Sequence, residues 1–225
     1  MKTIAIVGAG PGLGLSIAKR FGKQQFKVAL IARNADKLAA IIQELNNMDN
    51  QAKFYLADIS QLTQLKRALG EVKSDFGGID VLEFSPSAGL ETYKHILETT
   101  PQSVLEYVNG YLLPAIQCVN EVLPEMQQKG EGSILFSSGV SAQYPLPFLG
   151  NGSAVMAALR NYASNLHETL KVNGVYVGFL AIGTLIKPGT EGDPDLIAEA
   201  WYELYRNKDK FEETFPKDFK PVQEL

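Results

Sequence analysis

The chain has 225 residues, of which 45% are hydrophobic and 20% charged, and its net charge is −4. This length and composition are typical of a globular protein that buries one full core. The absence of a basic block argues against a nucleic-acid groove or an anionic membrane surface as partner, and a single cysteine, Cys118, excludes an internal disulfide framework.

The first predicted strand begins almost at Met1, which leaves no room for a signal peptide. The longest nearly apolar run, VYVGFLAIGTLI, is too short to span a bilayer. We therefore expect a cytoplasmic protein without a membrane partner, in which Cys118 packs inside an apolar stretch.

Short β-branched runs alternate with helical patterns along the chain. Strands are predicted at residues 3–9, 26–33, 52–58, 79–85, 132–138 and 175–182. Helices are predicted at residues 12–23, 36–47, 60–75, 101–129 and 151–172. The strands are continuous apolar runs, as in parallel sheets that are covered on both faces. The repeated βα units predict an α/β fold, a single-domain Rossmann-type doubly wound sheet of about six strands in the order 3-2-1-4-5-6.

Two helix starts carry recognisable signals. Thr100 followed by Pro101 is typical of a cap and first turn. Asp193 can cap a later helix whose single apolar face carries Leu196, Ile197, Ala200 and Leu204. We expect residues 1–190 to form the dinucleotide-binding domain and residues 191–225 to form a helical C-terminal extension packed on it.

A glycine-rich loop, GAGPGLG, lies between the first strand and the first helix. Gly8, Gly12 and Gly14 have the spacing GxxxGxG, and Gly10 and Leu13 lie within the same loop. Glycine lets the backbone turn sharply and approach a pyrophosphate, while the helix N-terminus offers free N–H groups and partial positive charge. The loop therefore predicts a dinucleotide site. The structural alternative is an ordinary tight turn between strand and helix.

The end of the second strand reads ALIARN and indicates which dinucleotide binds. An acidic residue at this position would accept the ribose 2′-OH of NAD, but Arg33 stands there, followed by Asn34. A guanidinium can hold a 2′-phosphate through two charge-assisted hydrogen bonds. The sequence favours NADP(H) over NAD(H), with a solvated arginine at a strand exit as the alternative.

These motifs together resemble the short-chain dehydrogenase/reductase family over roughly residues 3–187. GAGPGLG is similar to the family's glycine motif. The resemblance implies that Asp58 and Ile59 flank the adenine. In IDVLEFSPSAG the usual Asn-Asn-Ala-Gly is missing, and the resemblance implies that Ser85 and Pro86 lie near the cofactor ribose.

The resemblance continues into the catalytic half of the family. YVNGYLLP resembles the helix that carries a structural and catalytic asparagine, here Asn109. GSILFSSGVSAQYPLP resembles the segment of the catalytic serine, with Ser138 as the better match and Ser137 as the alternative. Gly183 is kept from the family's Pro-Gly motif, but Ile182 replaces the proline. The family's C-terminal strand and its Val-Asp-Gly-Gly signature have no counterpart here, and the tail is expected to be shorter and helical.

The family's Tyr-x-x-x-Lys dyad has no counterpart in PLPFLGNGSAVMAALRNY. Counting from Ser138 places Asn151 and Val155 at the two positions, and alignment of the later helix places Gly152 and Met156 there. Tyr144, Tyr93 and His95 are candidate substitutes, although packing or solvation is the favoured interpretation of each, and His167 is expected to be structural. No metal-ligand spacing and no nucleophile elbow are present.

Two functions of different classes follow. The first is an atypical NADP(H)-dependent oxidoreductase that reduces an activated carbonyl or quinone-like acceptor. The second is a non-catalytic NADP(H)-binding sensor or interaction protein that has lost the dyad. The resemblance also implies a homodimer, built through the long helices before and after the fifth strand, while the small-molecule substrate stays unnamed.

Overall fold

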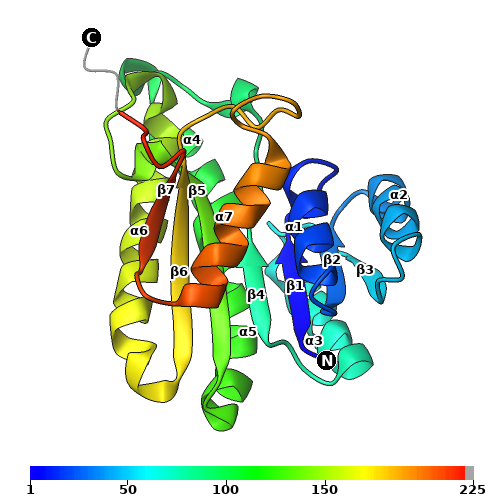
Figure 1. Ribbon diagram of the computed structural model, residues 1–225. Coiled ribbons are helices and arrows are strands. Elements are labelled where there is room, and N and C mark those ends of the chain that lie inside the picture. The colour runs from blue at the N-terminus through cyan, green and yellow to red at the C-terminus, as the bar shows by residue number, and fades with distance from the viewer. Residues whose placement is uncertain (221–225) are drawn as a thin grey trace.

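One parallel sheet forms the centre of the computed structural model, which describes residues 1–220 (Figure 1). Its seven strands are β1 (Thr3–Val7), β2 (Lys27–Ala32), β3 (Ala52–Leu56), β4 (Val81–Phe84), β5 (Gly132–Gly139), β6 (Val175–Ile182) and β7 (Glu212–Phe215). They pair in the order β3-β2-β1-β4-β5-β6-β7, and every pair is parallel. The predicted doubly wound topology is confirmed.

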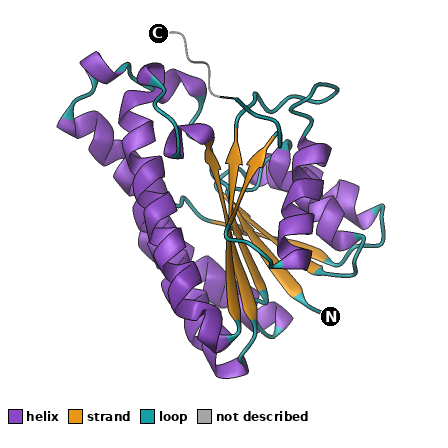
Figure 2. Cartoon of the chain, turned by 60° about the vertical axis from the view of Figure 1, so that its left-hand side comes forward, coloured by secondary structure: helices purple, strands orange, loops and turns teal. Residues whose placement is uncertain are grey.

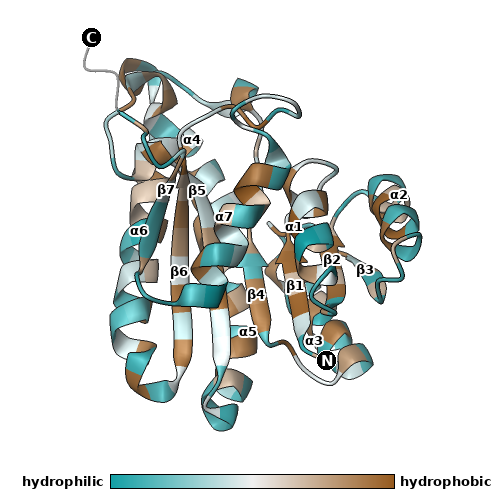
Figure 3. Cartoon of the chain, in the orientation of Figure 1, coloured by the Kyte–Doolittle hydropathy of each residue, from teal (hydrophilic) through white to brown (hydrophobic). Residues whose placement is uncertain are grey.

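Helices cover both faces of this sheet (Figure 2). They are α1 (Leu13–Gly22), α2 (Ala35–Asn46), α3 (Leu62–Phe76), α4 (Pro101–Tyr107), α5 (Leu113–Lys129), α6 (Gly150–Leu170) and α7 (Pro194–Asn207). Helices α3, α5 and α6 bury their apolar sides in one core, and α1, α2 and α7 bury theirs in the other. Burial on both faces explains why the inner strands β1 and β2 are largely apolar, as the hydropathy colouring shows (Figure 3).

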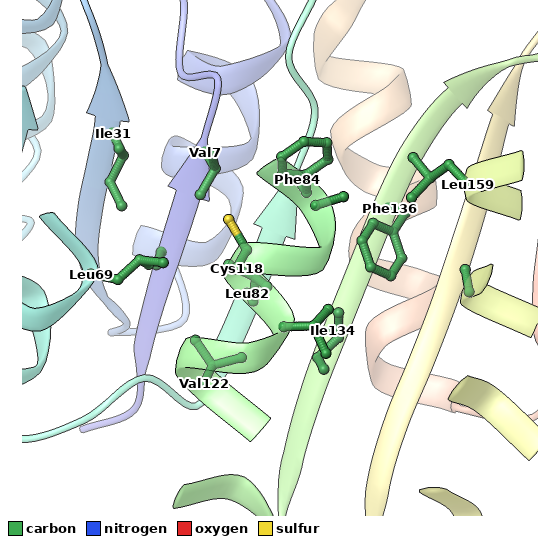
Figure 4. Close-up of a cluster of buried hydrophobic side chains, with 14 of the residues drawn as sticks. Val7, Ile31, Leu69, Leu82, Phe84, Cys118, Val122, Ile134, Phe136 and Leu159 are labelled. Carbon is green, nitrogen blue, oxygen red and sulfur yellow. The ribbon is translucent and has the colours of Figure 1, made fainter. Parts of the chain in front are cut away.

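The core between the sheet and helices α3, α5 and α6 is the larger of the two (Figure 4). Phe84 and Phe136 on neighbouring strands meet with ring centroids 6.2 Å apart, an edge-on geometry that aromatic rings favour. Cys118 of α5 lies fully buried in this core, as predicted.

The expectation of about six strands and a purely helical tail was wrong. Helix α7 is present, but the chain then returns as β7 at the edge of the sheet, parallel to β6. Its sequence, EETF, lacks the apolar run of the inner strands because an edge strand is only half-buried. Arg160 of α6 holds Glu212 of β7 through two hydrogen bonds of 2.6 Å.

The two predicted helix caps are confirmed. Thr100 accepts a hydrogen bond from the Ser103 N–H, and the Ser103 hydroxyl reciprocates in a capping box. Asp193 accepts from the Asp195 N–H at the start of α7. The prediction that Leu196 lies on the buried face of α7 is wrong, because this residue is 54% exposed. Trp201 lies fully buried on that face instead.

The predicted helix over residues 101–129 is interrupted. A π-helical turn, Val108–Leu112, joins α4 to α5. Such bulges add one residue to a turn and often occur at functional sites. The turn lies where the family resemblance places Asn109, and it sends Tyr111 inward.

Candidate functional site

The glycine loop is shaped by contact with the neighbouring strand end. Gly8 adopts φ +89°, a conformation that favours glycine, and a Cβ there would lie 2.5 Å from the Pro86 Cα. Gly14 packs closely on Ala9, where a Cβ would lie 2.9 Å from the Ala9 Cα. The loop is therefore held tightly between the end of β4 and the first turn of α1.

The outer side of the same loop is open. Added Cβ atoms at Gly10 and Gly12 would meet no atom within 4 Å. Helix α1 begins directly after Gly12, without a side-chain cap and without an acidic residue in its first turn. Leu13 is half-buried beside this helix end. An open glycine loop in front of an uncapped helix N-terminus fits a pyrophosphate, which the helix N–H groups and dipole would stabilise.

This loop lies at the point where the strand order reverses. Strands β1 and β4 are adjacent, while the chain travels outward to β2 and β3 in between. Doubly wound sheets bind ligands at this switch point, beyond the carboxyl ends of the strands. Ser85 and Pro86 follow β4 directly, both half-buried, and form the wall behind Gly8.

Arg33 and Asn34 follow β2 on the same edge of the sheet. Arg33 is exposed and forms no ion pair within the described residues 1–220. The Asn34 side chain caps α2 by accepting a hydrogen bond of 2.9 Å from the Lys37 N–H. The guanidinium is thus available to an anionic group, while the Asn34 carbonyl oxygen already serves the helix.

Asp58 and Ile59 follow β3. The Asp58 carboxylate accepts hydrogen bonds from the N–H and hydroxyl of Ser60, at 3.0 and 2.7 Å. Ile59 is half-buried and packs against the larger core. Both lie at the same sheet edge as the glycine loop, because the strands are parallel.

The two candidate serines of β5 point to opposite faces of the sheet. Ser137 shares its face with Leu135 and accepts a 2.9 Å hydrogen bond from the Trp201 indole N–H. Ser138 shares its face with Phe136 and α6. The Ser138 hydroxyl is buried and has no hydrogen-bond partner within residues 1–220. The geometry therefore favours Ser138 as the serine that meets a ligand on the α6 side.

Asn151, at one of the two positions counted for the dyad tyrosine, has a structural role. Its side chain is buried, accepts from the Lys94 N–H at 2.8 Å and donates to the Thr92 carbonyl at 3.2 Å. It thereby fixes residues 92–94, from the segment after β4, on the start of α6.

The neighbouring position is also covered by this segment. The Tyr93 ring lies directly over Gly152, so that an added Cβ there would overlap it. Ile96 lies over Gly150, where a Cβ would come 2.6 Å from the Ile96 Cα. The start of α6 is therefore occupied by residues 92–96 rather than by a tyrosine side chain of the helix itself.

The dyad lysine positions are apolar and buried. Val155 is 2% exposed and Met156 is 5% exposed. The Met156 sulfur accepts a hydrogen bond from the Ser141 hydroxyl at 3.2 Å. No tyrosine in the 225-residue sequence is followed by a lysine four positions later.

The other candidate residues lie as follows. Asn109 is exposed on the π-helical turn. His95 caps a short 3₁₀ turn by accepting from the Leu97 N–H. His167 is buried, with its Nδ1 atom 2.6 Å from the Val177 carbonyl oxygen, which gives it a structural role.

Gly183 lies under an aromatic ring from the C-terminal segment. Its N–H donates to the Phe215 carbonyl at 2.7 Å, and an added Cβ would overlap the Phe219 ring. Phe219 in turn packs against Tyr144, with ring centroids 5.7 Å apart. The sequence does not reveal this contact, because the two rings come from distant parts of the chain.

Sequence reasoning also missed a buried carboxyl group. Glu83 of β4 is 0% exposed, and its Oε2 and Oε1 atoms accept hydrogen bonds from the Ser85 and Ser137 hydroxyls at 2.9 and 3.3 Å. Burial raises the pKa of Glu83 to about 8, since the two serine hydrogen bonds offset only part of the desolvation. An isolated Glu in the apolar run IDVLEFS is the one signal that could have found it.

The tyrosines around the site are engaged and neutral. The Tyr111 hydroxyl donates to the Ser137 carbonyl at 2.6 Å, and the Tyr107 hydroxyl lies 2.6 Å from the Thr92 hydroxyl. Burial raises the pKa of Tyr93, Tyr107 and Tyr111 above its ordinary value. A phenol with a raised pKa is a poor proton acceptor at neutral pH.

Two kinds of feature are absent from residues 1–220. No helix there is long and apolar enough to cross a membrane. No group of three or more His, Cys, Asp or Glu side chains within this range is placed to hold a metal ion.

Comparisons with known proteins agree with this geometry. A family model described as short chain dehydrogenase matches residues 2–191. An uncharacterised oxidoreductase of Staphylococcus epidermidis is 27% identical over 191 residues, 85% of this chain and 81% of the relative.

Solved structures with the same fold include complexes with both dinucleotides. An alcohol dehydrogenase from the archaeon Thermococcus sibiricus, complexed with 5-hydroxy-NADP, has a TM-score of 0.85 at 24% identity and 100% coverage of both chains. A 3-oxoacyl-[acyl-carrier protein] reductase from Brucella melitensis with bound NAD has a TM-score of 0.79 at 21% identity, covering 90% of this chain and 83% of that one.

Proposed function

Since the chain belongs to the short-chain dehydrogenase family, we propose that it is an NADP(H)-dependent oxidoreductase that lacks the family's Tyr-x-x-x-Lys dyad and reduces an activated carbonyl or quinone-like acceptor. The observation that carries the proposal is the open glycine loop in front of the uncapped N-terminus of α1. A nicotinamide cofactor there would supply the hydride.

Different segments of the chain would bind different parts of the cofactor. The loop from Gly8 to Gly14 and the first N–H groups of α1 would hold the pyrophosphate. Arg33 would hold the 2′-phosphate, since its exposed guanidinium is free to form two charge-assisted hydrogen bonds. Asn34, Asp58 and Ile59 would contact the adenosine. Ser85 and Pro86 would lie near the second ribose, and Gly183 would lie at the nicotinamide end.

The direction of reaction follows from the missing base. Alcohol oxidation requires a group that accepts the alcohol proton, and Asn151, Gly152, Val155 and Met156 cannot do so. The buried and unpartnered Ser138 hydroxyl can orient an acceptor oxygen. We therefore propose reduction of an acceptor whose reduced form takes its proton from water.

Two aromatic rings near the nicotinamide end of the site favour a second function. Tyr93 lies over Gly152 and Phe219 over Gly183, so aromatic rings fill space beside the nicotinamide end. This arrangement supports a protein that binds NADP(H) without turnover, as a sensor or interaction module.

The test is to measure NADPH binding by calorimetry, and then NADPH turnover against a panel of carbonyls and quinones in both directions. Turnover of a quinone or activated carbonyl with no simple-alcohol oxidation supports the enzyme. Binding without turnover on any acceptor supports the sensor. Efficient alcohol oxidation would contradict the missing-base argument.

A variant pair ties the binding to the glycine loop. Gly10→Val places a side chain in the open space and is expected to abolish NADPH binding while leaving the fold intact. Gly70→Val, on α3, is the matched control, because a Cβ at Gly70 also meets no atom within 4 Å. Unchanged NADPH affinity in Gly10→Val would overturn the assignment of the site.

A further inference from the structure

A chain of hydrogen bonds links helix α7 to the wall of the glycine loop. The Trp201 indole N–H donates to the Ser137 hydroxyl at 2.9 Å. The hydroxyls of Ser137 and Ser85 both contact the buried Glu83 carboxyl, at 3.3 and 2.9 Å. Ser85 is followed by Pro86, which packs on Gly8. The carboxyl thus lies one hydroxyl away from the proposed cofactor site.

No positive charge offsets this carboxyl. The residues beside Glu83 on β1 and β5 are Ile6 and Leu135. Helices α1 and α7, which cover this face, bury only uncharged residues against it. Among the described residues 1–220, the titratable group whose pKa the Glu83 charge affects is Tyr111, and its hydroxyl is neutral and donates to the Ser137 carbonyl. The neutral form of Glu83 therefore persists to about pH 8.

The direction of each hydrogen bond depends on this proton. Because Trp201 donates to the Ser137 oxygen, the Ser137 hydroxyl is free to donate to Glu83 Oε1. A neutral acid with its proton on Oε2 reverses the bond in which the Ser85 hydroxyl donates to the carboxylate, because Oε2 then donates to the Ser85 oxygen and leaves the Ser85 hydroxyl hydrogen free to point outward. An ionised carboxylate only accepts, so it draws the Ser85 hydrogen inward.

We propose that neutral Glu83 turns the Ser85 hydroxyl outward as a hydrogen-bond donor to the dinucleotide, so that in the pH range where Glu83 of the free protein is ionised, dinucleotide binding is accompanied by proton uptake from water at Glu83. The inference rests on the proposed cofactor site and adds its regulation by pH. The charge of the pyrophosphate acts in the same direction, because a nearby carboxylate would repel it. Glu83 is a positioning residue, since it acts through Ser85.

Linkage makes the effect reciprocal, because a bound dinucleotide must favour the protonated acid as much as the protonated acid favours the dinucleotide. NADP⁺ affinity is expected to fall at least about fivefold between pH 7 and pH 9.5, the lower range of such couplings. Calorimetry at pH 8, in two buffers of different ionisation enthalpy, is expected to show proton uptake on binding.

Trp201, the only tryptophan of the chain, reports on the same network. Its fluorescence without cofactor is expected to titrate near pH 8 in the parent, where Glu83 ionises. In Glu83→Gln, which preserves shape and hydrogen bonding, this titration is expected to disappear. In Ser85→Ala it is expected to persist, because Glu83 and Ser137 are retained.

The binding experiment uses the same variants, with Glu71→Gln as the control that removes an exposed carboxylate on α3. Glu83→Gln is expected to bind NADP⁺ with no pH dependence and no proton uptake between pH 7 and 9.5. Ser85→Ala is expected to bind more weakly and with less proton uptake than the parent, because only the repulsion between the carboxylate and the pyrophosphate remains. Glu71→Gln is expected to behave as the parent.

The outcomes separate the two proposals. NADP⁺ binding by the parent with no proton uptake, or with the same pH dependence in Glu83→Gln, overturns the inference and leaves the cofactor site standing. Should Glu83→Gln fail to fold, parent-like proton uptake in Ser85→Ala overturns it equally. No dinucleotide binding by the parent at any pH overturns both proposals.

Discussion

At the scale of single residues, the proposed preference for NADP(H) rests on Arg33. Arg33 lies at the end of β2, the position at which NAD-binding folds have a carboxylate. It is exposed and forms no ion pair within residues 1–220. A cation there attracts a 2′-phosphate, and a carboxylate would repel it.

Arg33→Ala is expected to weaken NADPH binding by about 1.5–3 kcal/mol, which is the loss of one charge-assisted contact, and to leave NADH binding unchanged. Titration of both cofactors against parent and variant measures the effect. Arg67→Ala, an exposed arginine on α3, is the control. Equal NADH and NADPH affinities in the parent would refute the assignment.

At the scale of elements, the start of α6 is held by the segment that follows β4. Asn151 forms two hydrogen bonds to the backbone of residues 92–94, and Tyr93 stacks near Tyr107 with ring centroids 5.2 Å apart. The start of α6 and the segment after β4 therefore stabilise each other, and a substitution in one is expected to lower the stability of the other.

Asn151→Ala is expected to lower the free energy of unfolding by about 1–3 kcal/mol, because it removes both side-chain hydrogen bonds to the backbone of Thr92 and Lys94. Chemical denaturation measures the loss, and faster hydrogen exchange of the Lys94 amide locates it. Asn161→Ala, exposed on the same helix, is expected to change stability by less than about 0.5 kcal/mol. Equal effects of the two variants would contradict the role of Asn151.

Installing the dyad tests the missing catalytic half. Asn151→Tyr with Val155→Lys is expected to lower stability, because both positions are buried, and in the folded fraction to increase simple-alcohol oxidation by about 10²-fold or more, the usual contribution of a positioned acid or base. Gly152→Tyr with Met156→Lys is expected to destabilise the protein, because the Tyr93 ring occupies that space. Adding Tyr93→Ala should relieve this loss. NADPH binding with turnover restored by neither pair would favour the sensor.

At the scale of the whole molecule, one buried group gives the fold a pH dependence. Burial raises the pKa of Glu83 from 4.5 to about 8. Between these values the unfolded chain is ionised while the native state keeps its proton. The contribution of Glu83 to stability is therefore greatest below pH 4.5 and is lost as the pH rises toward 8.

The contribution of Glu83 is about 1.4 kcal/mol per pH unit within this window. Denaturation from pH 5.5 to 8 is expected to show the slope in the parent and a smaller slope in Glu83→Gln. The difference between the two curves isolates Glu83 from all other titrating groups. Parallel curves would show that the carboxyl ionises normally.

Assembly is the second prediction at this scale. Helices α5 and α6 present exposed small or apolar residues, among them Leu113, Ala154, Ala157 and Ala158. We expect a homodimer through these two helices, since apolar side chains gain by leaving water. Light scattering at micromolar concentration measures the mass. Ala157→Glu is expected to give a folded monomer, and a monomeric parent would refute the prediction.

The sequence by itself determined the local elements of this protein. Periodicity predicted six of the strands, and the caps at Thr100 and Asp193 and the glycine loop were read from short motifs, because such signals involve residues a few positions apart. It also contains no Tyr-x-x-x-Lys sequence, a motif that spans one helical turn.

The tertiary structure alone decided which distant residues meet. It added β7, whose polar sequence is held by Arg160, and it placed Ser137 and Ser138 on opposite faces. It joined Glu83 to Trp201 through Ser137, across more than 100 positions of sequence. Such contacts depend on how the helices pack on the sheet, and no local pattern of residues encodes that packing.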